Sequence, residues 1–155
     1  MKKGFIFIAL FLPYLAFAQC AYPDARSIQW KPMWLTTTEL PRNGKCYYYD
    51  TGYGIGESYE SALAAAMFHI STKREWATGQ TVNFINGKTV AANSDIVVKA
   101  RIEHEYWERC HDAVQGKQIY HVNILCIVAK HPDYDISRVR TNRKYFKQDK
   151  TNIIK

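Results

Sequence analysis

The stretch of residues 46–78 constrains the fold of this chain more than any other. It opens with three consecutive tyrosines, Tyr47–Tyr49, whose aromatic side chains favour an extended, half-buried backbone. A turn with Gly52, Gly54 and Gly56 follows, and glycine permits the positive φ angles and close approaches that a sharp strand-to-helix connection needs. Alanine-rich sequence comes next. The stretch therefore predicts a strand, a glycine turn and a helix in direct succession.

The predicted helix carries signals at both ends and along one face. Ser58 can cap its first turn, where Glu57 and Glu60 would lie near the positive end of the helix dipole. Gly79 is a natural stop. Small or apolar residues recur at spacings of three and four, as in a helix that packs on a sheet: Ala62, Ala65, Ala66, His69 and Ile70. On this face we expect His69 to be a hydrogen-bonded residue at the edge of the core rather than a catalytic base.

Further strands are predicted after the helix. Asn86-Gly87 between Val82–Ile85 and Lys88–Val90 is a two-residue hairpin signal. Two long strands follow, Asp95–Cys110 and Gln118–Lys130, joined by a turn that contains a glycine. We therefore expect an α+β fold, with one main amphipathic helix packed on an antiparallel sheet of about four to five strands in the order β-α-β-β-β-β.

The two long strands differ in their patterns. In Asp95–Cys110 apolar and polar residues alternate, which predicts one buried and one wetted face, and the buried side would carry Ile96, Val98, Ala100, Ile102, His104 and Tyr106. Gln118–Lys130 is apolar on both faces, so it is expected at the centre of the sheet. Residues 135–150 are expected to form a short basic helix.

The first twenty residues resemble a secretory leader. Two lysines precede the apolar run Phe5–Leu15, and a small-x-small cleavage signature ends at Ala18, so that Gln19 would begin the mature chain. The run is too short for a retained anchor, since a spanning helix needs about 20 apolar residues. Lipidation of Cys20 is the alternative, but the lipoprotein motif wants a small residue and a leucine where Gln19 and Phe17 stand. Plain export to the periplasm or the exterior is therefore favoured.

Charge divides the chain into three parts: a signal peptide at 1–18, one domain with an N-terminal arm at 19–137, and a basic tail at 138–155. Loss of the leader removes 18 of 155 residues and two lysines, which leaves 137 residues and lowers the net charge from +7 to +5. The tail holds seven basic residues and one acid. We expect it to be a solvated terminus, with contact to an anionic membrane surface as the alternative. Nucleic acid is not an expected partner of an exported protein.

Four cysteines, Cys20, Cys46, Cys110 and Cys126, are disulfide candidates because an exported chain folds in an oxidising compartment. No C-x-x-C motif indicates a redox site or a zinc knuckle. A hairpin centred near Gln115 would hold Cys110 and Cys126 some 10 Å apart at about 3.4 Å per residue, beyond the roughly 7 Å that a disulfide tolerates. We expect Cys46 or Cys20 to be the partner that ties the N-terminal region to this hairpin.

Several short motifs resemble catalytic or cofactor sites without matching them. The glycines of Gly52–Gly56 miss the spacing of the dinucleotide fingerprint. Gly87–Thr89 resembles the end of a P-loop, but Val82 stands where the partner glycine should be. His104–Glu108 lacks the second histidine of a zinc-protease helix. Cys110-His111 are neighbours on a strand and would point to opposite faces. We therefore expect no catalytic, cofactor or metal residues.

Aromatic and basic residues supply the candidate partner-binding surface, which comprises Trp30, Trp34, Arg101 and Trp107. Exposed tryptophans could bind a glycan. Most tryptophans are largely buried, so the alternative is that these residues pin the N-terminal arm and pack across strands.

Four segments together resemble a known envelope pattern: Pro32–Leu35, Tyr47–Tyr49, Gly54–Ser58 and Glu60–Ala66. Over about residues 32–130 the chain resembles the LPP-type small bacterial lipoproteins and the related N-terminal domain of the flagellar assembly protein T. The resemblance implies a helix packed on an antiparallel sheet, an envelope location and no established chemistry, so it assigns no catalytic residue. The chain departs from the lipoprotein members in lacking a good lipidation box.

Two functions are therefore expected as alternatives. The first is a secreted or periplasmic, non-enzymatic envelope or assembly module that binds a protein or a cell-wall partner. The second is a small periplasmic hydrolase or other enzyme that uses His104, His111 or His121. An enzyme needs two or three ionisable groups converging in a concave pocket, which separates the two hypotheses.

Overall fold

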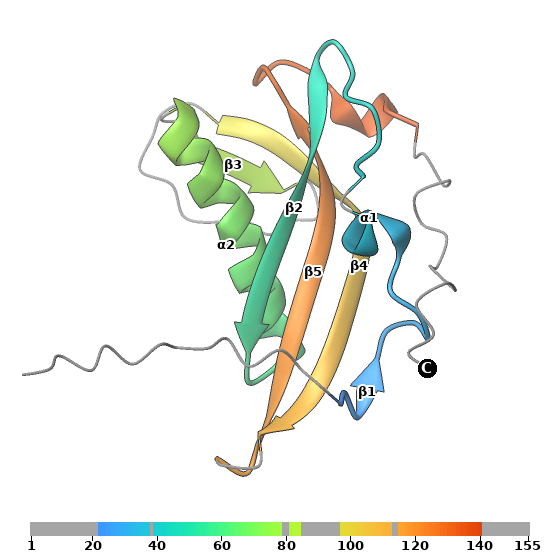
Figure 1. The fold of residues 1–155 in the computed structure, drawn as a ribbon. Helices are drawn as coiled ribbons and strands as arrows, with labels where there is room; N and C mark the ends of the chain where they lie inside the picture. Colours follow the sequence, from blue (N-terminus) through green and yellow to red (C-terminus); the bar gives the residue numbers. More distant parts are fainter. Residues whose placement is uncertain (1–21, 38, 79–80, 85–96, 113–114, 141–155) are drawn as a thin grey trace, which may run out of the picture.

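A five-stranded, mostly antiparallel sheet with one main helix forms the body of the protein (Figure 1). The computed structural model describes residues 22–37, 39–78, 81–84, 97–112 and 115–140. The elements, in chain order, are β1 (Ala25–Arg26), α1 (Met33–Thr36), β2 (Tyr47–Gly56), α2 (Tyr59–Thr78), β3 (Thr81–Phe84), β4 (Val97–Asp112), β5 (Lys117–Ala129) and a 3₁₀ turn, η1 (Ile136–Arg138). None of the helices among these residues is long and apolar enough to cross a membrane.

The strand order is β1-β4-β5-β2, and the predicted α+β class is confirmed. β5 is central, as predicted, and its buried residues point to both faces: Val122, Ile124, Leu125, Cys126, Ile127 and Val128. β3 pairs with β4 in parallel, which differs from the predicted antiparallel arrangement. The predicted turn at Asn86-Gly87 lies outside the described residues.

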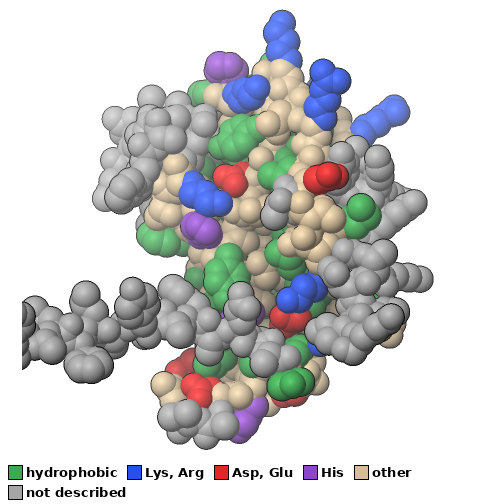
Figure 2. Space-filling model, viewed as in Figure 1, with side chains coloured by type: hydrophobic (Ala, Val, Ile, Leu, Met, Phe, Trp, Pro, Cys, Tyr) green, Lys and Arg blue, Asp and Glu red, His purple; other side chains and the backbone are tan. Residues whose placement is uncertain are grey.

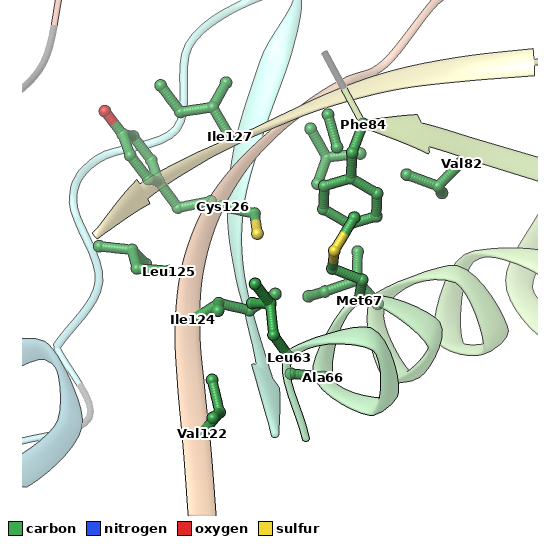
Figure 3. Packing of buried hydrophobic residues seen from close by; sticks show 14 of the residues in the cluster. Leu63, Ala66, Met67, Val82, Phe84, Val122, Ile124, Leu125, Cys126 and Ile127 are labelled. Atoms are coloured by element: carbon green, nitrogen blue, oxygen red, sulfur yellow. The ribbon is translucent and has the colours of Figure 1, made fainter. Parts of the chain in front are cut away.

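The helix α2 begins where the capping residue predicted it. Ser58 Oγ accepts the backbone N–H of Ser61 at 3.2 Å, and Ser61 Oγ accepts the N–H of Ser58 at 3.1 Å, so two free donors of the first turn are satisfied. The predicted alanine face meets the sheet, with Ala62 and Ala66 fully buried. In the same layer Met67 lies against Phe84 of β3 (Figure 3).

A β-bulge in β4 divides the strand into two halves. Ile102 pairs with Cys126 but His104 pairs with Leu125, so Glu103 is an extra residue. Because paired residues share a face, Ala100 and Ile102 lie on the α2 side while His104 and Tyr106 lie on the opposite side. The predicted single buried face over Asp95–Cys110 is therefore wrong: both faces of β4 are covered, each over half of its length.

The sheet face opposite α2 is covered by segments from both ends of the described chain. Trp34 of α1 is 2% exposed, and its Nε1–H donates to His104 Nδ1 at 3.2 Å. Arg101 donates to three backbone carbonyls of the C-terminal segment, those of Ile136, Ser137 and Val139. A helix was predicted over 135–150. Of this segment, residues 135–140 are described and form only the single 3₁₀ turn η1, while residues 141–150 lie outside the described residues.

Candidate functional site

A partly open cavity of about 190 Å³ lies between the N-terminal arm and the edge of β2. The arm contributes Trp34, Leu35 and Leu40 to its wall. The other side is formed by residues 51–53 of β2, with His69 of α2 and Asn123 of β5. The cavity exists because the arm folds over this face of the sheet, which brings four segments distant in sequence to one place.

The polar atoms of the cavity are neutral and few. No lysine, arginine, aspartate or glutamate lines it among the described residues. The Asn123 side chain makes no hydrogen bond within the described part of the chain, so its carbonyl and its NH₂ group are both available. Burial, together with the positive charge of Lys73, lowers the pKa of His69, which favours a neutral imidazole. Within the described residues the cavity is thus largely apolar, is lined by no Lys, Arg, Asp or Glu, and contains one amide without a hydrogen bond.

Tyr53 lines this cavity and also contacts a neighbouring polar cluster, which comprises His121, Glu108, Tyr106 and Lys31. Its hydroxyl lies 2.6 Å from Nδ1 of His121, and its ring remains 37% exposed. Glu108, opposite His121 in the β4–β5 ladder, accepts the hydroxyl of Tyr106 at 2.7 Å and lies 3.5 Å from Lys31 Nζ. Burial, and then the charge of Glu108, raises the pKa of Tyr53, so its hydroxyl stays protonated near neutral pH. The Tyr53 ring is therefore held in place at the mouth of the cavity.

Beside the cavity, side chains form hydrogen bonds with outward-pointing backbone groups of β2. The N–H of Tyr53 donates to His69 Nδ1 at 3.1 Å, and the carbonyl of Thr51 accepts Lys73 Nζ at 2.7 Å. The N–H of Thr51 donates to the carboxylate of Asp50 at 2.8 Å. Because these three groups are already paired, an added strand would have to displace side chains at this part of the edge.

The histidines of the enzyme hypothesis lie apart from one another. His111 pairs with Gln118, which places it on the α2 side of the sheet, whereas His104 and His121 lie on the other side. His104 pairs with Leu125, four residues along β5 from His121, a separation of roughly 14 Å at about 3.4 Å per residue. Burial lowers the pKa of both His104 and His121. His104 and His121 therefore serve as hydrogen-bonding groups, the first to Trp34 and the second to Tyr53.

The residues predicted as a partner-binding surface do not come together. Trp34 is buried under the arm and lines the cavity, and Trp30 is half-buried. Trp107 lies on the α2 side, where its ring contacts Tyr59 and Tyr120. Arg101 holds the C-terminal segment through its carbonyl contacts. The packing alternative describes these four residues better than an exposed aromatic surface does.

Two of the four disulfide candidates are free thiols. Cys46 is half-buried and free, so of the two predicted partners for the hairpin, Cys46 and Cys20, the first is wrong; Cys126 is buried and free. Cys126 and Cys110 are not bonded to each other, as predicted, and they lie on opposite faces of the sheet. Cys20 lies outside the described residues.

Sequence reasoning missed the residues that give the cavity its chemistry, Leu40, Thr51, Tyr53 and Asn123. Asn123 left a usable signal, because it is a polar residue inside the apolar run of a central strand, between Val122 and Ile124. The described residues hold no group of three or more His, Cys, Asp or Glu side chains that could bind a metal ion. No family model, curated protein or solved structure matches this chain.

Proposed function

We propose that this protein is an exported, non-enzymatic envelope or assembly module, and that the cavity beside the arm is where its partner, a protein or a wall polymer, binds. The observation that carries the proposal is that one hollow combines apolar walls, an exposed Tyr53 ring and an Asn123 amide that makes no hydrogen bond to the described residues. Binding sites combine apolar lining with a few convergent polar groups in this way.

The separation of the histidines supports the binding function over the enzyme. General acid–base catalysis needs its groups within hydrogen-bond reach of one reacting atom. His104, His111 and His121 lie at different places and on two faces, and the cavity itself is lined by no carboxylate or lysine among the described residues.

Export supports the envelope as the place of action, and it rests on the leader and on the resemblance to envelope lipoproteins. Mass spectrometry of the exported protein should find Gln19 as the first residue, with a cyclised or an open N-terminus. A diacylglyceryl group on Cys20 would instead place the protein among the lipoproteins.

Site-specific photo-crosslinking in intact cells tests the binding function. A photoreactive residue in place of Leu40, at the cavity, is expected to trap a defined envelope component. The control places the same residue at the exposed Gln118 in the far hairpin, which should not trap that component. Equal trapping at both positions, or none at Leu40, would count against the proposal.

A further inference from the structure

We propose that the cavity binds the acetamido group of an N-acetylated sugar, so that the partner is a wall or envelope glycan rather than a protein. This inference rests on the proposed binding function and names its ligand. It follows from the size, the charge and the free polar atoms of the cavity, and from the paired backbone edge beside it.

Size and charge limit what can enter. Sites that enclose a whole small ligand measure roughly 300–1,000 Å³, so a cavity of about 190 Å³ takes one group of a larger molecule. Transfer of an unpaired ion into apolar surroundings is very costly, and the lining carries no charged side chain among the described residues. Figure 2 shows several Lys and Arg side chains at the end of the molecule where β2 begins, and the exposed Arg42 and Lys45 precede that strand in the sequence. A phosphate or carboxylate therefore meets no charged partner among the described lining residues, which favours a neutral inserted group.

The side-chain amide of Asn123 determines which kind of neutral group fits the cavity best. An apolar side chain would bury the Asn123 amide without a partner, which opposes binding. An acetamido group offers a carbonyl and an N–H, which match the NH₂ and the carbonyl of Asn123, while its methyl group can contact the leucines of the arm. The sugar ring to which it is attached would then lie at the mouth, where the fixed Tyr53 ring presents an exposed apolar face.

A peptide also carries amide groups, but the edge of β2 disfavours it. An extended peptide gains most of its affinity by pairing its backbone with a free strand edge. At Thr51 and Tyr53 that edge is already paired with Asp50, His69 and Lys73. A pendant acetamido group needs only the cavity and no free edge.

Isothermal titration calorimetry of the exported protein, residues 19–155, tests the inference with three linear trisaccharides. The trimer of N-acetylglucosamine should bind, and the trimers of glucosamine and of glucose should bind at least about tenfold more weakly, because they lack the acetyl group. Asn123→Ala should weaken binding of the acetylated trimer about tenfold. The matched control, Gln118→Ala, removes an exposed amide from the same strand and should leave affinity unchanged.

If Asn123→Ala does not fold, the side-chain NH₂ resonances of Asn123 in the wild-type protein give the same answer, since they should shift with the acetylated trimer alone. Equal affinity for acetylated and deacetylated trimers, or no binding of the acetylated trimer, would overturn the inference. If the acetylated trimer fails while the crosslinker at Leu40 traps an envelope protein, the ligand assignment falls and the binding function stands. If both experiments fail, both proposals fall.

Discussion

Replacing Gly54 by alanine tests how closely α2 approaches β2. An alanine Cβ at this position would lie 2.1 Å from the carbonyl oxygen of Ala62 and 2.4 Å from the backbone nitrogen of Ala66. Both atoms belong to the helix backbone, so no side-chain rotation relieves the contact. The helix would have to retreat by about 1 Å to bring the shorter distance above 3.0 Å.

Such overpacking costs roughly 1–3 kcal/mol, and we expect about 3 kcal/mol because backbone atoms are involved. For a domain of this size that corresponds to a fall in melting temperature of roughly 10 °C. With a urea m-value of roughly 2 kcal/mol/M, the unfolding midpoint should fall by about 1.5 M. Urea unfolding followed by far-UV circular dichroism measures this directly.

Gly116→Ala is the matched control. Gly116 has a φ of +66°, and the Cβ of an alanine there would meet no atom within 4 Å, so the substitution costs only the strain of a left-handed backbone, about 1 kcal/mol. We therefore expect Gly54→Ala to be the more destabilised of the two variants. A Gly54→Ala midpoint equal to or above that of Gly116→Ala would refute the close packing of α2 on β2.

Three further predictions concern packing, titration and the cysteines. Ala66→Leu should destabilise the fold by roughly 1–3 kcal/mol while Ala64→Leu, on the exposed side of α2, should not; equal melting temperatures would mean that the helix face is assigned wrongly. Burial lowers the pKa values of three histidines, so the unfolded chain binds more protons than the folded chain as the pH falls, and the urea midpoint should decrease from about pH 7.5 to about pH 5.5. His121→Gln should reduce that decrease, and a midpoint that is flat or rises toward acid would contradict the reasoning. With Cys46 and Cys126 free, we predict that the remaining pair, Cys20 and Cys110, forms a disulfide; non-reducing peptide mapping should find that linked peptide, and alkylation of both residues without reduction would exclude it.

Local signals in the sequence were sufficient for β2, α2, β4 and β5 and for one register. Ser58 marked the start of α2, and the turn after Asp112 fixed the β4–β5 pairing, in which Asp112 lies opposite Lys117. These features depend on capping and turn chemistry over a few residues. The sum of paired residue numbers in this hairpin, 229 at that pair, agrees with the predicted value of about 230.

The bulge at Glu103 and the cavity could not be predicted in the same way. A bulge leaves the composition of a strand unchanged and only reverses which residues face each side, so the alternation after Ile102 was assigned to the wrong face. The cavity needs the arm to fold over the sheet, and no short pattern in Trp34–Leu40 indicates where the arm will lie. Among the cavity residues, Asn123 alone could have been noticed in the sequence, because it is a polar residue within an apolar run.

One measurement tests the central claim most directly, because it requires no prior choice of ligand. Enzymatically solubilised envelope fragments are added to ¹⁵N-labelled protein comprising residues 19–155, and the shifts of its backbone amide resonances are mapped. We predict the largest shifts around the cavity, at Leu35, Leu40, Thr51, Tyr53 and Asn123. Largest shifts in the β4–β5 turn, with the cavity resonances unchanged, would contradict the claim that this hollow is the binding site.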